Sequence, residues 1–165
     1  MITLPQRISE RGAEARLLLA ECRGPSFAGY SLVLATKCMQ LMDLVLWNRV
    51  KNPGPFLAKQ GTLLAVITAP GQFQGFQHYP HYANGIAHNL QQMVDIANSR
   101  GDKRAPVFAD YVSAAIRISV SETLSDPSPG MLVAWRTAAS GSPGPEFAFF
   151  TTVLGTSFYY MAKGL

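Results

Sequence analysis

Charge is scarce in this sequence. Only 15% of the 165 residues are charged, whereas 48% are hydrophobic, and this composition is too apolar for an intrinsically disordered chain. Long apolar runs are also missing, because runs such as those at 17–20 and 63–67 are far shorter than the ~20 residues that cross a bilayer. We therefore expect one globular domain over residues 1–165, with no membrane span.

Clusters of basic residues are absent as well. The formal net charge is +4, so the surface favours anionic partners in general. The lysines and arginines are scattered singly and are not interleaved with aromatic residues, which argues against nucleic acid as a partner. An anionic cell-wall polymer and an acidic membrane surface both remain compatible with this charge.

Cysteines are few, and a leader peptide is not evident. Cys22 and Cys38 are expected to be small buried hydrophobic residues, and a disulfide stays open because sequence does not give the distance between them. The N-terminus lacks a basic segment followed by an apolar one. We therefore expect a chain made in the cytoplasm without a signal peptide, or a piece of a longer chain.

Motifs for metal or phosphate chemistry are weak or missing. His78 and His81 form a His-x-x-His pair, but neither they nor His88 have a nearby acidic residue or cysteine, so their spacing is poor for zinc. A glycine-rich phosphate loop and a Gly-x-Ser-x-Gly motif are not found. We expect no metal and no other cofactor, and interpret 72–82 as irregular structure forming a polar and aromatic wall.

Periodicity and capping residues predict a mainly helical chain. Ser9 is a candidate N-cap and Gly24 with Pro25 a stop, so a first helix is expected over 9–22. The other expected helices are at about 34–48, at 84–100 with Asn84 as cap, and at 105–124 with Pro106 in its first turn; 63–67 is ambiguous. Aromatic and β-branched residues at 132–136 and 147–160 indicate strands. The expected fold class is mainly α (α+β), with a small C-terminal β-hairpin.

One carboxylate differs from the rest. Most of the ten acidic residues lie in polar surroundings typical of exposed positions, but Glu21 follows the apolar run 17–20 and is expected at the C-terminal end of a buried helix. An apolar pocket raises the pKa of a carboxyl group and keeps it able to donate a proton near neutral pH. The alternative is a structural glutamate paired with Arg16, Arg23 or Arg49.

Five short segments carry a further signal. They are AECRG at 20–24, NRVK at 48–51, VITAPGQF at 66–73, DPSPG at 126–130 and VLGTSFY at 153–159. In this order they resemble A-E-A-R-G-E, N-R-V, V-I-x-x-P-G-Q-F, D-P-T-x-G and I-G-x-H-x-F of the cell-wall hydrolase family that includes the spore-cortex-lytic enzymes. Cys22 and Pro25 depart from the family pattern, and Ser157 replaces its closing histidine, whose role therefore does not transfer.

The resemblance implies a lysozyme-like catalytic domain that acts as a lytic transglycosylase on the MurNAc–GlcNAc bonds of a peptidoglycan glycan strand. Glu21 is then the catalytic acid, which protonates the glycosidic oxygen and later takes the proton of the C6 hydroxyl as a 1,6-anhydro ring closes. Gln72 and Phe73 are candidate substrate-binding residues, and Tyr159 and Tyr160 are candidates for the wall of a cleft. Structural packing is the alternative for these four.

Other functions stay open. A hydrolytic muramidase would use Asp95 or Asp110 to position a water molecule, and a non-catalytic peptidoglycan-binding or structural domain would keep the fold alone. Without a secretion signal, the chain would reach the cell wall or periplasm as a phage lysin or as a toxin delivered into a rival cell. The toxin would have an immunity protein as its partner.

Overall fold

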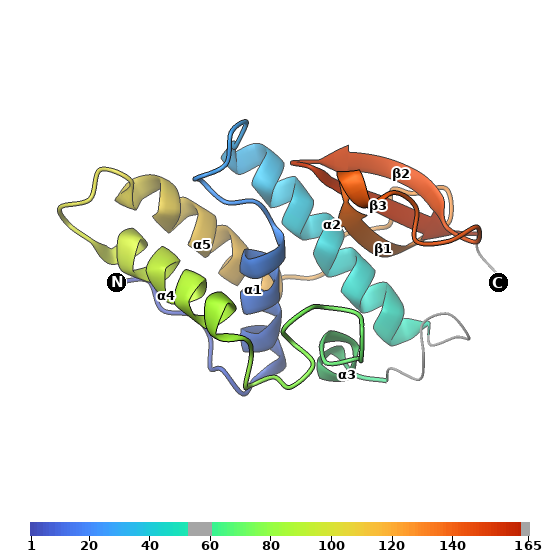
Figure 1. Cartoon of the computed structure of the whole chain (residues 1–165), viewed down its shortest axis with the longest axis horizontal. Helices are drawn as coiled ribbons and strands as arrows, with labels where there is room; N and C mark the ends of the chain where they lie inside the picture. Colours follow the sequence, from blue (N-terminus) through green and yellow to red (C-terminus); the bar gives the residue numbers. More distant parts are fainter. Residues whose placement is uncertain (53–60, 163–165) are drawn as a thin grey trace.

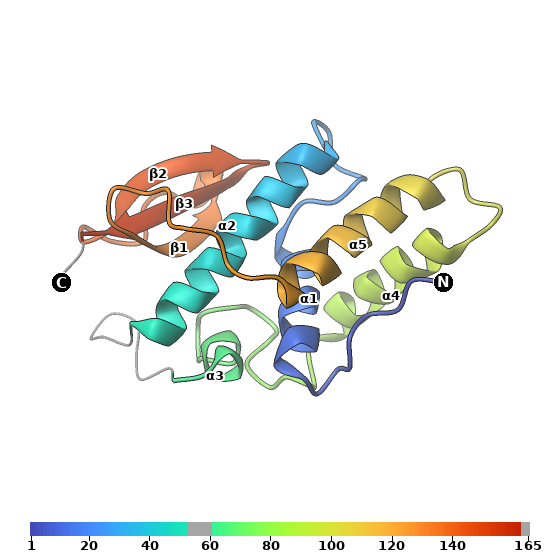
Figure 2. The same cartoon turned by 180° about the vertical axis from the view of Figure 1, so that it is seen from behind.

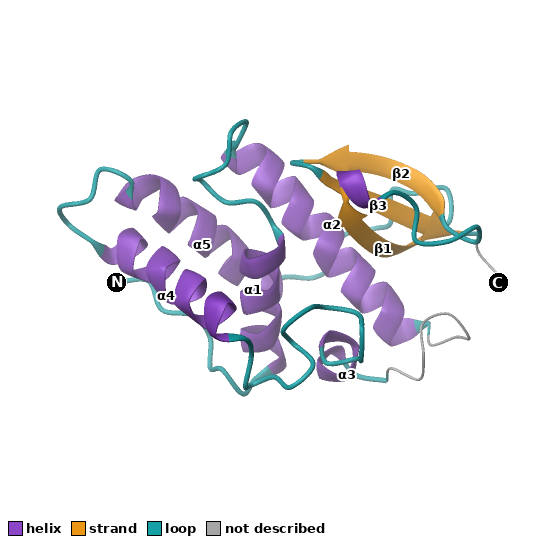
Figure 3. Ribbon diagram, viewed as in Figure 1, coloured by secondary structure: helices purple, strands orange, loops and turns teal. Residues whose placement is uncertain are grey.

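The computed structural model describes residues 1–52 and 61–162 of the chain. Its helices are α1 (Glu10–Glu21), α2 (Leu32–Lys51), α3 (Leu63–Ile67), α4 (Asn84–Asn98), α5 (Ala105–Val120) and the 3₁₀ helix η1 (Ala138–Ser140). Its strands are β1 (Met131–Thr137), β2 (Ala148–Val153) and β3 (Thr156–Met161). The prediction of a mainly helical α+β chain with a small C-terminal hairpin is confirmed (Figure 3).

The helices and the sheet lie toward opposite ends of the molecule (Figure 1). α4 and α5 pack side by side at one end, and α2 runs between them and the sheet, in contact with both α5 and β1. The segment that joins α5 to β1 crosses from the helical end to the sheet on the face seen in Figure 2. α1 contacts α2, α3, α4 and α5, so it is the central helix of the helical end.

The central position of α1 follows from its sequence. Ser9 caps the helix as predicted, since its hydroxyl accepts a hydrogen bond from the backbone N–H of Gly12 at 3.0 Å. A side chain at Gly12 would meet the carbonyl of Gln6 at 1.9 Å, so glycine lets the incoming chain lie directly against the helix. Ala13, Ala15 and 17–19 are fully buried, and this burial on most sides agrees with the apolar stretch in the sequence.

The sheet is antiparallel, with the strand order β1-β3-β2. The hairpin is the β2–β3 pair, in which Val153 lies opposite Thr156, so the segment 147–160, expected as one strand paired with 132–136, forms both strands of the hairpin. Its two turn residues, Leu154 and Gly155, have φ values of 46° and 72°, as a two-residue turn that matches the strand twist requires. β1 pairs with the other edge of β3, with Trp135 opposite Phe158, so the hairpin becomes a three-stranded sheet.

Several helix boundaries differ from the predictions. The N-cap of α4 is Ala83 and makes no side-chain hydrogen bond, so the prediction of Asn84 as the cap was wrong; that helix also ends at Asn98 rather than at 100. α5 ends at Val120 rather than at 124, whereas the proline in its first turn is confirmed. The ambiguous run at 63–67 forms α3, capped by the hydroxyl of Thr62.

Both cysteines pack in the main core. Cys22 is 4% and Cys38 is 0% exposed, and both are free thiols, as expected of small buried hydrophobic residues. Over the described part of the chain, every helix is too short or too polar to cross a membrane.

Candidate active site

Glu21 is the last residue of α1 and is half-buried. The hydroxyl of Tyr111 on α5 holds this end of the helix, because it donates to the carbonyl oxygen of Cys22 at 2.7 Å and lies 3.3 Å from that of Leu19. A Cβ atom at Gly24 would lie 3.2 Å from the Tyr111 ring, so glycine lets the chain leave the helix close against that ring. The position of Glu21 is therefore set by a contact with α5.

The carboxylate of Glu21 has a partner on the sheet. Trp135 on β1 donates its indole N–H to Oε2 of Glu21 at 3.2 Å. Burial raises the pKa of Glu21, and the hydrogen bond from Trp135 partly offsets this rise because it favours the ionised form. The carboxyl group therefore keeps its proton to a higher pH than a free glutamate does, because its pKa is raised, and it remains partly open to solvent.

Glu21 forms no salt bridge with an arginine in the described part of the chain. Among residues 1–52 and 61–162, the salt bridge found joins Arg104 to Asp102. Arg16, one of the three candidate partners, instead donates to the carbonyl oxygens of Pro5 and Gly12 at 2.9 Å. The alternative of a glutamate neutralised by a neighbouring arginine is therefore wrong for the described part of the chain.

Aromatic stacking joins Trp135 to the segment after α3. The rings of Phe73 and Trp135 lie 4.9 Å apart at an angle of 28°, and Phe73 is only 5% exposed. Of the two roles considered for Phe73, the structure shows support of the loop through packing. Its ring holds the indole that in turn contacts Glu21.

Arg49 anchors the same group of residues from α2. Its Nε donates to the carbonyl oxygen of Val133 at 2.7 Å and its Nη1 to Oε1 of Gln72 at 2.8 Å, while the guanidinium lies 5.6 Å from the centre of the Phe73 ring. Burial lowers the pKa of Arg49 to about 10, so the side chain still carries its charge at neutral pH. Gln72 is exposed beside this buried cation, and its amide nitrogen remains free of the bond to Arg49.

Two further contacts tie the sheet to this region. Asn48 donates to Oδ2 of Asp126 at 2.9 Å and to the carbonyl oxygen of Leu132 at 2.8 Å, and Asp126 also accepts from the backbone N–H of Leu132. At the other end of the sheet, a Cβ atom at Gly155 would lie 2.4 Å from the guanidinium of Arg23. The five segments singled out in the sequence are thus linked in pairs, and the segment 66–73 is joined to Glu21 through Trp135.

The two tyrosines of β3 are placed differently. Tyr159 is 5% exposed and its ring packs edge-on against Phe149, with the ring centres 6.1 Å apart. Tyr160 is half-buried and packs against the main core. None of the hydrogen bonds or ring contacts in the described residues joins either tyrosine to Glu21, and their place in the wall of a cleft stays a prediction.

The remaining candidates lie away from this group. Asp95 on α4 and Asp110 on α5 are exposed, and Asp95 accepts a hydrogen bond from Gln91 at 2.8 Å. His78, His81 and His88 are exposed as well, and the described ranges contain no group of three or more His, Cys, Asp or Glu side chains placed to hold a metal ion.

The expected aromatic wall at 72–82 is mostly turned inward. The rings of Phe76, Tyr79 and Tyr82 stack on one another with centres 5.6–6.0 Å apart. Phe76 is fully buried and Tyr79 is 8% exposed, and Arg7 lies over the ring of Tyr82. This part of the loop is a packed element that supports Gln72 and Phe73.

The sequence analysis did not identify three residues that matter in the structure, namely Trp135, Glu14 and Asp43. Trp135 is one of only two tryptophans, and this rarity was the available signal, but its partner Glu21 is 114 positions away. The expectation that acidic residues other than Glu21 are exposed was wrong for Glu14 and Asp43, which are 1% and 4% exposed. Their burial follows from helix packing that composition does not report.

Comparison with known proteins found no relative of this chain. No protein-family model matches the chain, and the curated proteins and solved structures compared with it likewise contain no match.

Proposed function

We propose that this chain is a peptidoglycan-cleaving glycosidase, and more specifically a lytic transglycosylase that acts on MurNAc–GlcNAc bonds with Glu21 as general acid and base. The observation that carries the proposal is the environment of Glu21. This carboxyl group is partly exposed, its pKa is raised by burial, and its partner is a neutral indole rather than a cation. Such a group is suited to donating a proton near neutral pH.

The arrangement of the resembling segments also supports the proposal. Trp135 contacts both Glu21 in the first segment and Phe73 in the third, and the third segment contacts the second through Gln72 and Arg49. Chance matches in a sequence have no reason to pack against one another. Such contacts are expected if the segments build one site.

In the proposed reaction, Glu21 protonates the glycosidic oxygen while positive charge develops at C1 of the MurNAc sugar. The carboxylate that results is stabilised by the hydrogen bond from Trp135. It then takes the proton of the C6 hydroxyl as that oxygen bonds to C1, which regenerates the acid and leaves a 1,6-anhydro sugar. The contacts of Glu21 in the described residues include no second carboxylate, and this route needs none.

Gln72 is the best placed candidate for binding substrate. Arg49 occupies its Oε1, so the amide nitrogen is left to donate a hydrogen bond to a sugar hydroxyl or an N-acetyl oxygen. Arg49 acts as a positioning residue, because it orients Gln72 and packs on the ring of Phe73.

The test is digestion of purified peptidoglycan sacculi, with the soluble products analysed by mass spectrometry. We expect anhydro-muropeptides from the wild-type protein and their loss in Glu21→Gln. The matched control is Glu146→Gln, the same substitution on the loop before β2, which should keep activity. Products with reducing ends would replace the transglycosylase with a hydrolytic muramidase, and binding without any release would favour a non-catalytic domain.

A further inference from the structure

A second pair of carboxyl groups lies inside the helical end of the molecule. Glu14 on α1 and Asp43 on α2 are 1% and 4% exposed, and the two side chains are within hydrogen-bonding reach of each other. Within the described residues, both carboxyl oxygens of Glu14 and Oδ1 of Asp43 find no hydrogen-bond donor. Buried polar atoms without a partner are rare and costly, so this pair requires an explanation.

The surroundings of the pair can be specified from each element that packs against it. On α1, Glu10 and Arg11 precede Glu14 by one turn and are the nearest charges to it. On α2, Trp47 follows Asp43 by one turn and lies beside it, and Lys51 is a nearby cation. Thr123, after α5, also lies near Asp43.

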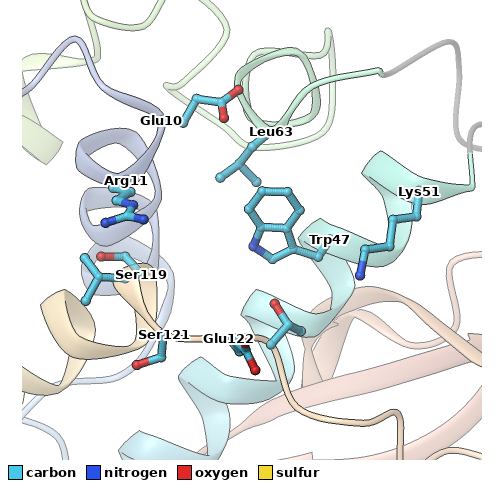
Figure 4. Close-up of a pocket in the computed structure, with 10 residues that line it drawn as sticks. Glu10, Arg11, Trp47, Lys51, Leu63, Ser119, Ser121 and Glu122 are labelled. Carbon is cyan, nitrogen blue, oxygen red and sulfur yellow. The ribbon is translucent and has the colours of Figure 1, made fainter.

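The same side chains line a pocket of about 420 Å³ between α1, the end of α2, α3 and the segment after α5 (Figure 4). Glu122 on that segment adds a further carboxylate to the lining. Because Trp47 and Thr123 contact both the pocket and Asp43, the carboxyl pair lies directly behind the pocket wall. The pair itself is almost fully shielded from solvent.

Two carboxylates in contact cannot both be ionised at low energetic cost, particularly away from water. If one of them keeps its proton, it becomes a donor and the other becomes its acceptor. One hydrogen bond between α1 and α2 then accounts for one of these oxygens on each side chain, and the second oxygen of Glu14 stays without a donor. A hydrogen bond between a carboxyl group and a carboxylate is among the strong ones.

We propose that Glu14 and Asp43 share a single proton at neutral pH, and that this proton is a pH-sensitive lock between α1 and α2 that opens as the pH rises. The lock holds the same helix that ends at Glu21, two turns further on. The inference concerns the stability of the fold and does not depend on what Glu21 does.

The titration of the pair agrees with this proposal. Burial, the hydrogen bond to Asp43 and its charge raise the pKa of Glu14 from 4.5 to about 10. Burial raises the pKa of Asp43 as well, although its hydrogen bonds partly oppose the rise. The folded state therefore keeps a proton that the unfolded chain releases above pH 4.5. Stability from this group is fully present below that pH and is lost as the pH rises toward 10.

The experiment compares thermal unfolding between pH 5 and pH 9 in the wild-type protein, Glu14→Gln and Glu10→Gln. We expect the melting temperature of the wild type to fall by about 5–10 °C over this range. In Glu14→Gln the amide donates permanently to ionised Asp43, so most of this fall should disappear and the variant should be the more stable protein at pH 9. Glu10→Gln, an exposed position one turn earlier, removes only a weaker charge effect on Glu14 and should keep most of the wild-type dependence.

Parallel pH profiles for the wild type and Glu14→Gln would overturn the proposal. So would a rise in melting temperature on adding calcium at pH 8 that is seen in the wild type and not in Glu14→Gln, because the pair would then hold a cation rather than a proton. If the variant does not fold, carboxyl carbon NMR of the wild type decides. A carboxyl signal assigned to Glu14 or Asp43 that is still protonated at pH 8 supports the lock, and full ionisation of both side chains at that pH excludes it.

Discussion

The hydroxyl of Tyr111 offers a sharp test of how the end of α1 is held. The last carbonyl groups of a helix lack partners within the helix, and Tyr111 supplies a donor to two of them, at Leu19 and Cys22. Its ring is fully buried, so water cannot replace the hydroxyl in Tyr111→Phe. An acceptor left buried without a donor costs about 1–3 kcal/mol, which corresponds to a loss of roughly 3–10 °C in melting temperature for a domain of this size.

Tyr30 provides the matched control, because its ring contacts Tyr111 edge-on with the ring centres 6.0 Å apart. Its hydroxyl is buried but finds no hydrogen-bond partner in the described part of the chain. Tyr30→Phe removes an unsatisfied polar atom, so we expect it to be neutral or slightly stabilising. The two variants make the same chemical change a few ångströms apart and should move stability in different directions.

The assay is urea unfolding followed by both circular dichroism and tryptophan fluorescence, which also tests for a two-state transition. Equal midpoints for Tyr111→Phe and the wild type would refute the role given to this hydroxyl. A loss in Tyr30→Phe as large as that in Tyr111→Phe would do the same, because the effect would then follow ring packing rather than the hydrogen bond.

Two further predictions concern the contacts of Glu21. Trp135→Phe keeps a ring against Phe73 but removes the hydrogen bond to the ionised carboxylate, so the pKa of Glu21 should rise; a pH titration of the glutamate carboxyl carbons by NMR measures this, and an unchanged value would contradict the bond. Arg49→Lys keeps the charge but loses the planar guanidinium, which donates to both the side chain of Gln72 and the carbonyl oxygen of Val133. We expect a loss of about 1–3 kcal/mol in chemical unfolding and slower sacculus cleavage, whereas wild-type behaviour in both would remove the positioning role.

Local signals predicted much of the fold. Ser9 capped the first helix because a cap requires only a hydroxyl three residues before an N–H, and the proline at the start of α5 lies where its missing N–H costs nothing. The helix ends were harder to place, since Asn84 had the chemistry of a cap but the chain begins the helix after Ala83. Helix ends fray, and tertiary contacts decide the last turn.

The candidate site was predicted in part. Glu21 was identified because an apolar run precedes it, and its burial and raised pKa follow. Gln72 lies beside Arg49 in the same group, whereas Tyr159 and Tyr160 show packing contacts and none with Glu21 among the described residues. Alternation along a strand shows that neighbouring side chains point to opposite faces, yet it does not show which face meets Glu21.

The sequence by itself determined the helices, the short hairpin and the one carboxylate that follows an apolar run, because these depend on residues within about one helical turn or one strand of each other. Only the tertiary structure decided that Trp135 meets Glu21, that Arg49 holds Gln72, and that a pair of acidic side chains is buried between α1 and α2. The physical reason is that these contacts join positions 23 to 114 residues apart or lie on separate helices. Their energies depend on distance and burial, which the order of residues along the chain does not contain.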